Sequence, residues 1–381
     1  MTSSLVGLEM CIRDRNMWYL SGKEPAYLDM LADCLEKFDA YLWKTRDSDG
    51  DGCLESFCVY DTGEDNALRY GHAPVYCTTD TPPEDADVVP MASMDVTSFS
   101  YACRDTLAEN SRLRGDGRES EWREKADAVA ANLKARLWDD KRHACFDRDK
   151  HGKTIDVLCH NTLRCMYWGS ISQEMADAFV RQHLLNPQEF WTPLPLPSVA
   201  VNDPMFRNAP ENNWSGQCEG LTYQRAIIAL ERYGYEPLVT KLGRKLLDAI
   251  IRGGYVFTQQ FDPFTGEPSR VGMVSHEVLS RDSDEPFQDS YGPTLLAALE
   301  YIAHIWGIAL VGDEVWFSLG SGLSYTYAQR FGDDVYEIKS DGRSGSIYKN
   351  RITVGSAPCG VRLVTNRDGK ILRTVKIEEG V

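Results

Sequence analysis

The chain has 381 residues, of which 43% are hydrophobic and 26% are charged, and this composition is typical of a globular protein with one large core or two domains. A net charge of −16 and a pI near 4.9 argue against nucleic acid as a partner, because an acidic surface repels phosphate backbones. No apolar run is long enough for a membrane span, so we expect no membrane partner either. Eleven scattered cysteines without a C-x-x-C pair indicate reduced thiols in a cytoplasmic protein, and we expect no metal and no cofactor.

The first residues form a separate region. The run from Ser4 to Arg15 resembles translated sequencing-adapter read-through at the ends of assembled metagenomic genes. We therefore expect residues 1–15 to be an artefact or a tail, and the chain to be a fragment whose authentic start lies further upstream. A genuine short N-terminal tail is the alternative.

From Glu24 to Trp43 apolar residues recur at helical spacing, which predicts an amphipathic helix. The following stretch, 47–70, is acidic and turn-rich and predicts a loop. Its second half concentrates three carboxylates, an amide, an arginine and two aromatic rings: Tyr60, Asp61, Glu64, Asp65, Asn66, Arg69 and Tyr70. Carboxylates beside aromatic rings suit a sugar, which needs acid and base groups at its anomeric carbon and flat faces for stacking. A solvated acidic loop is the alternative.

The start of this loop also matches part of a calcium-binding pattern. Asp47, Asp49, Asp51 and Gly52 fit the opening positions of an EF-hand loop, but Cys58 stands where that loop needs its closing glutamate. We therefore do not assign a calcium site.

The stretch from Asp47 to Tyr70 resembles the segment D-x-D-G-D-G-x-x-E … D-S-G-x-D-N-S-x-R of glycoside hydrolase family 63 and its mannosylglycerate-hydrolase-like relatives. In that family the aspartate before the asparagine is the general acid, and the resemblance implies this role for Asp65. Like charge nearby is expected to raise its pKa and keep it protonated. The same loop supplies the residues that we expect to contact substrate, namely Tyr60, Asp61, Glu64, Asn66 and Arg69.

Residues 71–90 are rich in Pro, Thr and Asp and predict an irregular excursion. Helices are expected next over about 90–110, 120–138, 161–168 and 172–184. Asp95 lies near the start of the first of these helices, where a carboxylate favours the helix dipole. The resemblance implies that Asp95 shapes the sugar pocket, and an ordinary acid at a helix start is the alternative.

Two aromatic segments follow. Residues 189–200 are apolar, proline-punctuated and similar to the family's F-x-T-x-x-P-x-P-S-V-A, which suits a pocket wall around Trp191. Residues 212–224 open a helix that runs to Gly234. Many family members carry W-R-G-P-x-W here, whereas this chain keeps Trp214 and Gly216 but has Ser215 and Gln217. We expect Trp191, Trp214 and Gln217 to bind the substrate.

Glu219, at the start of this helix, has no counterpart in the family pattern. It is either an additional catalytic carboxylate or a favourable acid in the first turn of a helix.

After a helix over 236–251, residues 256–267 resemble the family's E-x-Y-(D/N)-P-x-T-G-E loop, in which the glutamate four residues before proline is the general base. Here that residue is Gln259, and an amide cannot accept the proton of a water molecule. Another acid can serve as base, namely Glu219, Glu267 or Asp262. An external nucleophile such as phosphate needs no base, and a third account is sugar binding without cleavage. Asp262 and Glu267 also have a simpler reading as turn residues. We therefore assign the role of second catalytic carboxylate to Glu219, and we expect Gln259 to bind the substrate.

Residues 275–289 are acidic and irregular and predict a surface insertion or lid. The last long helix is expected over 291–308, with Leu295, Leu296, Leu299, Ile302 and Ile305 facing inward. From Val311 the chain predicts short antiparallel strands separated by Gly, Asp and Asn, with β-type runs at 315–319, 325–331, 335–338, 345–349 and 361–365.

About eight amphipathic helices with acids and aromatic rings in their connections indicate paired helices rather than a simple bundle. The resemblance implies an (α/α)6 barrel of twelve helices in two rings. The expected fold is therefore mainly α: an (α/α)6 toroid over 16–310, incomplete at its N-terminus, with a small C-terminal antiparallel β module over 311–381.

The expected function is hydrolysis of a small α-linked glycoside or oligosaccharide. By resemblance the reaction inverts the anomeric centre, with Asp65 protonating the leaving oxygen and a second carboxylate about 6.5–9.5 Å away activating water. Because Gln259 replaces the expected base, the alternative is a non-catalytic carbohydrate-binding pseudo-enzyme or a phosphate-dependent relative. A structural helical repeat is not favoured, because no motif recurs at a fixed period. The sequence makes no prediction of the oligomeric state.

Overall fold

The computed structural model describes residues 18–19, 22–209, 213–269 and 291–379. The expected adapter artefact at 1–15 and the expected lid at 275–289 therefore lie outside the described residues.

Eight α-helices occur in these ranges. Seven match the expected helices to within a few residues, whereas the helix expected to open at 212 begins at Gly220, because Cys218 and Glu219 before it form a short strand. The eight helices are α2 (Pro25–Thr45), α3 (Met94–Arg114), α4 (Glu119–Arg136), α5 (Thr162–Trp168), α6 (Gln173–Phe179), α7 (Gly220–Glu231), α8 (Glu236–Arg252) and α9 (Gly292–Trp306). A short π-helical turn, Val180–Leu184, continues α6 and completes the expected helix over 172–184.

The connections between the helices alternate in length. Long connections follow α2, α4, α6 and α8, whereas turns of only four residues follow α3, α5 and α7. Gly115 and Gly169 end α3 and α5 in the left-handed conformation that such tight turns need. Because helices joined by short turns run antiparallel, all four long connections lie at the same end of the helix pairs.

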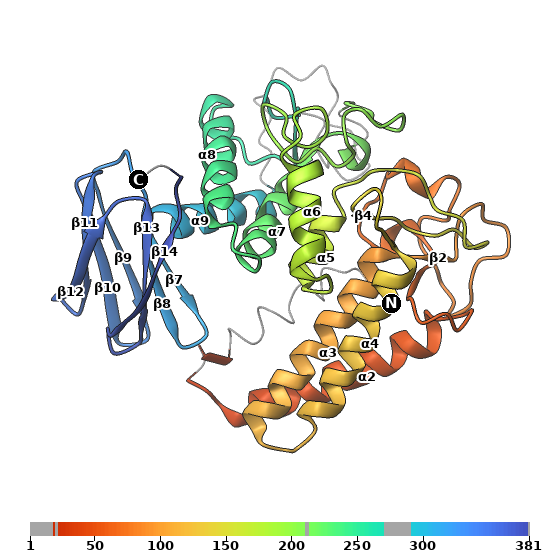
Figure 1. The fold of residues 1–381 in the computed structure, drawn as a ribbon, viewed down its shortest axis with the longest axis horizontal. Coiled ribbons are helices and arrows are strands. Elements are labelled where there is room, and N and C mark those ends of the chain that lie inside the picture. Colours follow the sequence, from red (N-terminus) through yellow and green to blue (C-terminus); the bar gives the residue numbers. More distant parts are fainter. Residues whose placement is uncertain (1–17, 20–21, 210–212, 270–290, 380–381) are drawn as a thin grey trace.

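The described helices form two layers. Consecutive members of the series α3, α5, α7 and α9 pack against each other, while α2 and α4 pack on α3, and α8 packs on α7 and α9. Figure 1 shows the resulting arc, which leads from α2, α3 and α4 to α7, α8 and α9. The described residues thus supply four of the six outer and inner helix pairs that an (α/α)6 toroid contains.

One helix faces a different way from the expectation. Leu295, Leu296 and Leu299 of α9 are 44%, 40% and 56% exposed, whereas Ala297, Ala298, Tyr301 and Ile305 are buried. Nearly every position of α9 is apolar, so hydrophobic periodicity alone does not select a buried face. Packing selects it: a Cβ atom on Gly243 of α8 would lie 2.3 Å from Tyr301, so α8 and α9 approach closely along the Tyr301 side.

A second close approach provides a test of this packing. A Cβ atom on Gly220, the first residue of α7, would lie 1.7 Å from Thr294 Oγ1, and that hydroxyl is itself held by the Thr258 carbonyl at 2.6 Å. We expect Gly220→Ala to reduce the free energy of unfolding by about 1–3 kcal/mol in urea titrations, because the added methyl group separates α7 from α9.

Gly292 is the matched control, since it also begins a helix, without a positive φ, and has open space around it. We expect Gly292→Ala to change stability by less than about 0.5 kcal/mol. Equal effects of the two substitutions would contradict the close packing of α7 on α9.

Eight strands follow α9 and form two four-stranded antiparallel sheets, ordered β12-β11-β10-β9 and β14-β13-β8-β7. They are β7 (Ile308–Val311), β8 (Glu314–Leu319), β9 (Tyr325–Phe331), β10 (Asp334–Ser340), β11 (Ser344–Lys349), β12 (Ile352–Pro358), β13 (Val361–Asn366) and β14 (Ile371–Lys376). Five of them match expected runs, and β7, β12 and β14 are additional.

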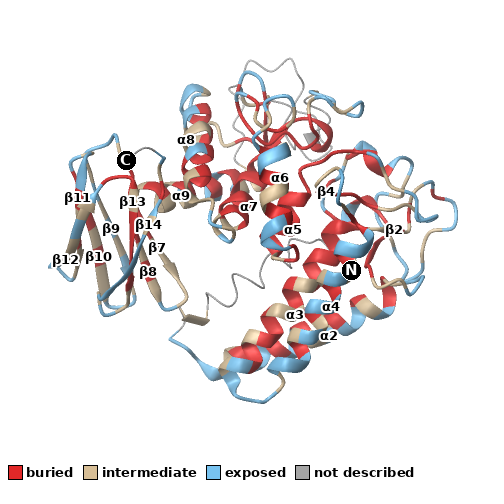
Figure 2. Ribbon diagram, viewed as in Figure 1, coloured by how far each residue is buried: buried red, intermediate tan, exposed pale blue. Residues whose placement is uncertain are grey.

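The described residues form three hydrophobic cores. The largest joins residues of all eight helices, and the second lies between the two sheets around Phe317, Tyr336 and Ile347. The third joins Val59, Tyr70, Met91 and Trp214. Figure 2 shows the buried residues gathered on the facing sides of the helices and within the sheets. In the described residues, no helix combines the length and the apolar character needed to cross a bilayer.

A buried ion cluster joins the sheets to the helices. Arg362 of β13 donates to Glu231 of α7 at 2.6 Å and to Ser318 at 2.9 Å, and the His304 ring lies 2.9 Å from the same carboxylate. Burial alone would raise the pKa of Glu231, but the charges of His304 and Arg362 outweigh it and hold this pKa at about 2.

This depressed pKa makes stability depend on pH. In the unfolded chain the pKa of a glutamate is about 4.3, so the contribution of Glu231 is present above that pH and is lost as the pH falls toward 2. We expect Glu231→Gln to lower stability by about 3 kcal/mol at pH 7 and to flatten the decrease between pH 4.3 and 2. Unfolding in urea at several pH values measures both effects. Glu314→Gln, in a more exposed pair with Arg373, is the control and should cost less than about 1 kcal/mol.

Candidate active site

The acid loop, defined here as residues 57–70, lies in the long connection between α2 and α3. Strand β1 (Glu55–Ser56) precedes it and pairs with β2 (Met91–Ala92), so the connection is tied at its base. Two short 3-10 helices, Val59–Asp61 and Leu68–Tyr70, shape the loop. The loop therefore sits at the end of the helix pairs where all the long connections meet.

Asp65 is exposed at the centre of this loop. Among the described residues, no group forms a hydrogen bond or ion pair with its carboxyl group. Partial desolvation raises the pKa of Asp65 above its ordinary value, and like charge does not contribute, contrary to our expectation. The reason is that the neighbouring carboxylates face arginines: Asp61 lies 3.7 Å from Arg46 Nε, and Glu64 is paired with Arg69.

Glu64, Arg69 and Asp95, which we expected to contact substrate, lie in a buried ion cluster. The cluster also contains Asp147, Asn161 and Arg164. Arg69 pairs with Glu64, donates from Nε to Asp147 at 3.0 Å and lies 3.7 Å from Asp95. Arg164 pairs with Glu64 at 2.9 Å and with Asp95 at 3.0 Å. The Asn161 amide donates to both of these carboxylates, at 2.8 and 2.6 Å. These buried side chains therefore hold the acid loop in place through Glu64 and Arg69.

Sequence reasoning did not identify Asp147, Asn161 and Arg164 as parts of the site. For Arg164 a signal was present: it is the one charged residue of α5, a seven-residue helix with every residue buried. A charge in such a helix requires a partner, because an unpaired buried charge is very costly. For Asp147, in an irregular segment, and Asn161, in the turn before α5, we find no equivalent signal.

His160 lies beside the cluster, with its ring 6.1 Å from that of Trp214. Burial, and then the positive charges of Arg164, Arg69 and Arg225, hold the pKa of His160 well below its ordinary value. The imidazole is therefore neutral at pH 7 and does not add to the positive charge of the cluster.

Asn66 and Trp214 connect the acid loop to the segment before α7. The Asn66 side-chain oxygen accepts from the Trp214 backbone amide at 3.1 Å, and Ser215 Oγ accepts from the Leu68 amide at 2.9 Å. Trp214 is buried, 3% exposed, with the Arg164 guanidinium 5.2 Å from its ring centre. In this structure Asn66 and Trp214 therefore hold the loop in place.

Glu219 lies on a short β ribbon, and Gln259 immediately precedes the partner strand of that ribbon. Strand β5 (Cys218–Glu219) pairs with β6 (Gln260–Phe261), and the Gly220 amide donates to the Gln259 carbonyl at 2.9 Å. The side chains of Glu219 and Gln259 are both buried. The residue opposite Glu219 is Gln260, whereas Gln259, in the position of the family's base, stands opposite Gly220, one residue further along the ribbon.

The other candidate acids have structural roles. Asp262 accepts from the backbone amides of Phe264 and Thr265 and from the side chain of Asn208, all within 2.9 Å. Burial alone would raise the pKa of Asp262, but these hydrogen bonds hold it below its ordinary value, so it is a weak base. Glu267 is exposed on the same turn.

Two remaining residues that we expected to bind the substrate, Gln217 and Trp191, are partly or fully buried. Gln217 is buried, with its amide bonded to Asn208 at 2.9 Å and to the Ser269 hydroxyl. Trp191 is half-buried and packs against the large core.

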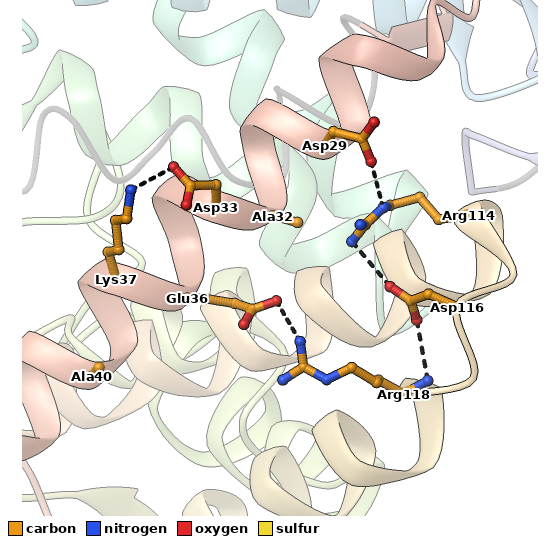
Figure 3. A pocket seen from close by; sticks show the side chains of 9 residues that line it. All are labelled: Asp29, Ala32, Asp33, Glu36, Lys37, Ala40, Arg114, Asp116 and Arg118. Atoms are coloured by element: carbon orange, nitrogen blue, oxygen red, sulfur yellow. Dashed lines mark hydrogen bonds and ion pairs between the residues drawn. The ribbon is translucent and has the colours of Figure 1, made fainter.

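A cavity of about 660 Å³ adjoins the acid loop. Tyr60 and Asp61, both expected to contact substrate, line it together with Phe38 and Tyr41 of α2, Arg46 and Tyr76. This volume lies within the range of small-molecule pockets. Another groove, of about 580 Å³, lies at the opposite end of α2 beside the turn between α3 and α4. Figure 3 shows that the charged side chains of this groove pair with each other, as in Arg114 with Asp29 and Arg118 with Glu36. We therefore do not consider it as the substrate site.

Three aspartates before the acid loop are the residues best placed to hold a cation. One carboxylate oxygen from each of Asp47, Asp49 and Asp51 lies within 4.8 Å of the others. Each carboxylate also accepts a backbone amide within the turn, and Cys58, at the closing position of the calcium pattern, offers no oxygen.

Comparisons with known proteins agree with this architecture. The structure is similar to the mannosylglycerate hydrolase of family 63 from Thermus thermophilus, with a TM-score of 0.59 and 16% identity over 77% of this chain and 74% of that chain. It is similar to an uncharacterised conserved protein of the same organism, with a TM-score of 0.58 and 19% identity over 68% of this chain and 72% of that one. A sialidase matches with a TM-score of 0.66 and 13% identity over 96% of this chain and 33% of its own. No curated protein matches the sequence.

These similarities confirm the (α/α)6 toroid fold. A family model assigns the class of protein, a glycosidase with this fold: the model of the mannosylglycerate hydrolase MGH1-like glycoside hydrolase domain matches residues 14–282. The chain belongs to this family.

Proposed function

We propose that the protein hydrolyses a small α-linked glycoside or oligosaccharide with inversion of the anomeric centre. Asp65 is the general acid that protonates the leaving oxygen, and Glu219 is the carboxylate that activates water. The observation that carries the proposal is the state of Asp65: an exposed carboxyl group with a raised pKa on a loop that buried ion pairs hold in place. A general acid needs this combination, because it must remain protonated and reach the substrate.

The cavity beside the acid loop supports a carbohydrate substrate, although Asp65 is not among the residues that line it. The adjoining cavity carries the rings of Tyr41, Tyr60 and Tyr76, which offer flat faces for a sugar. The family 63 mannosylglycerate hydrolase, which shares this fold, has been crystallised with glucose and with D-glycerate. Glu219 belongs to the segment that Asn66 and Ser215 tie to the acid loop, so both carboxylates lie on connected elements.

The second candidate function rests on Gln259. Because this amide stands where the family has its base, the site suits either phosphate as the nucleophile or sugar binding without cleavage. Glu219 favours hydrolysis, since a carboxylate remains on the strand that pairs with the residues directly after Gln259.

One experiment separates these functions. The protein is incubated with methyl and p-nitrophenyl α-glycosides of glucose and mannose, with and without inorganic phosphate, and proton NMR follows the first sugar anomer released. Hydrolysis without phosphate that first yields the β anomer supports the proposal. Retention of the α anomer overturns inversion, a sugar phosphate formed only with phosphate identifies a phosphorylase, and binding without turnover identifies a binding protein.

A further inference from the structure

Arg164 connects the parts of the site more extensively than its position in the sequence suggests. It lies on α5, in the inner layer, and is 3% exposed. Its Nη1 donates to the Thr62 carbonyl at 3.1 Å and to Asp95 at 3.0 Å, and its Nη2 pairs with Glu64 at 2.9 Å. Its guanidinium group also faces the Trp214 ring at 5.2 Å.

These contacts lie on both sides of Asp65. Thr62 and Glu64 precede it in the acid loop, and Asn66, which follows it, is bonded to the backbone of Trp214. Both peptide neighbours of Asp65 are therefore anchored, one to Arg164 directly and the other to the residue on which Arg164 stacks. Gly63, between Thr62 and Glu64, has a φ of +69°, which glycine adopts readily, and the contacts of Arg164 with Thr62 and Glu64 hold the chain on either side of it.

We propose that Arg164 is a positioning residue that sets the orientation of the Asp65 carboxyl group through Thr62, Glu64 and Trp214. This inference rests on the proposed role of Asp65 as general acid. The simpler account is that Arg164 only neutralises the buried charges of Glu64 and Asp95. The two accounts differ in what a lysine can replace, because lysine keeps the charge but lacks the planar fork that bonds two acceptors and stacks on a ring.

The test therefore compares Arg164→Lys with a matched variant, Arg104→Lys. Arg104 pairs with Asp39 through two nitrogens, donates to the Lys125 carbonyl and stacks on Trp43 at 4.2 Å, but it lies between α2, α3 and α4 and does not touch the acid loop. It makes the same kinds of contact as Arg164 without access to Asp65.

The decisive measurement is the dependence on the leaving group. A 2,4-dinitrophenyl α-glycoside departs without a proton, whereas a methyl α-glycoside requires the general acid. For Arg164→Lys we expect kcat/KM on the methyl glycoside to fall about 100-fold, and on the dinitrophenyl glycoside less than about threefold. Arg104→Lys should leave both values within about twofold of the wild type.

Two results would overturn the inference. If Arg164→Lys hydrolyses the methyl glycoside like the wild type, charge alone is sufficient. If both substrates lose activity equally, Arg164 supports the fold and not the acid.

Hydrogen exchange followed by mass spectrometry tests the positioning independently of activity. Amides of residues 60–70 should exchange faster in Arg164→Lys than in Arg104→Lys and the wild type, because the loop loses its anchor. Unchanged protection of these amides overturns the inference. If the wild type cleaves neither glycoside, the proposed function fails, and the exchange measurement still decides whether Arg164 anchors the loop.

Discussion

Replacing Asp65 by asparagine is expected to reduce hydrolysis of an alkyl α-glycoside by about 10²–10⁴-fold, because the leaving alkoxide then departs without a proton. The pH profile should change as well. A general acid is active only while protonated, so wild-type activity falls as the pH rises through the pKa of Asp65, which partial desolvation raises. This basic limb should be absent from the profile of Asp65→Asn. Steady-state kinetics between pH 4 and pH 9 measure both effects.

Asp85→Asn is the control for this substitution. Asp85 is an exposed aspartate of the same long connection between α2 and α3, and it lies outside the acid loop. Its replacement should leave activity within about twofold of the wild type. Full activity of Asp65→Asn on an alkyl glycoside would show that another group donates the proton.

Replacing Arg69 by methionine is expected to destabilise the protein by about 3–5 kcal/mol, because it leaves Glu64 and Asp147 buried with one partner fewer. Arg69 is buried and contacts three carboxylates. Because these carboxylates are also buried, bulk water cannot readily replace the hydrogen bonds that Arg69 provides. Urea unfolding followed by circular dichroism measures the loss.

The control for Arg69→Met is Arg112→Met. Arg112 pairs with Glu109 at 2.6 Å on the surface of α3, where such a pair contributes at most about 1 kcal/mol. A loss of less than about 1 kcal/mol for Arg69→Met would mean that the buried carboxylates are neutral in the folded protein.

Most of the secondary structure could be predicted from hydrophobic period and turn residues, but three strands could not. Strand β7, Ile308–Val311, is a short apolar run that directly follows a helix, and periodicity cannot separate the two. Strand β12, Ile352–Pro358, contains Gly, Ser and Pro, which are rare in strands. Strand β14, Ile371–Lys376, lies at the edge of its sheet and is mostly exposed, so it lacks alternation.

The site was predictable only where its residues are neighbours in the sequence. The acid loop could be recognised because its acids and rings fall within eleven residues. The partners of that loop lie far along the chain: Asn161 bonds to Glu64 across 97 residues, and Trp214 bonds to Asn66 across 148. For this reason several residues expected at the substrate, such as Glu64 and Arg69, belong to the support beneath it. The exposed leucines of α9 have a related cause, since close packing of neighbouring helices, and not local pattern, decides which face is covered.

The long-range anchoring of the acid loop has a consequence for how the protein acquires activity during synthesis. Helices α2, α3 and α4 can pack as soon as they leave the ribosome. The acid loop, however, has no fixed shape until Arg164 and Ser215 have also been synthesised and can bind it. About 150 further residues must therefore be made before the loop, already complete in sequence, is held in place. A nascent chain halted before Arg164 would contain the whole acid loop and still lack an ordered site.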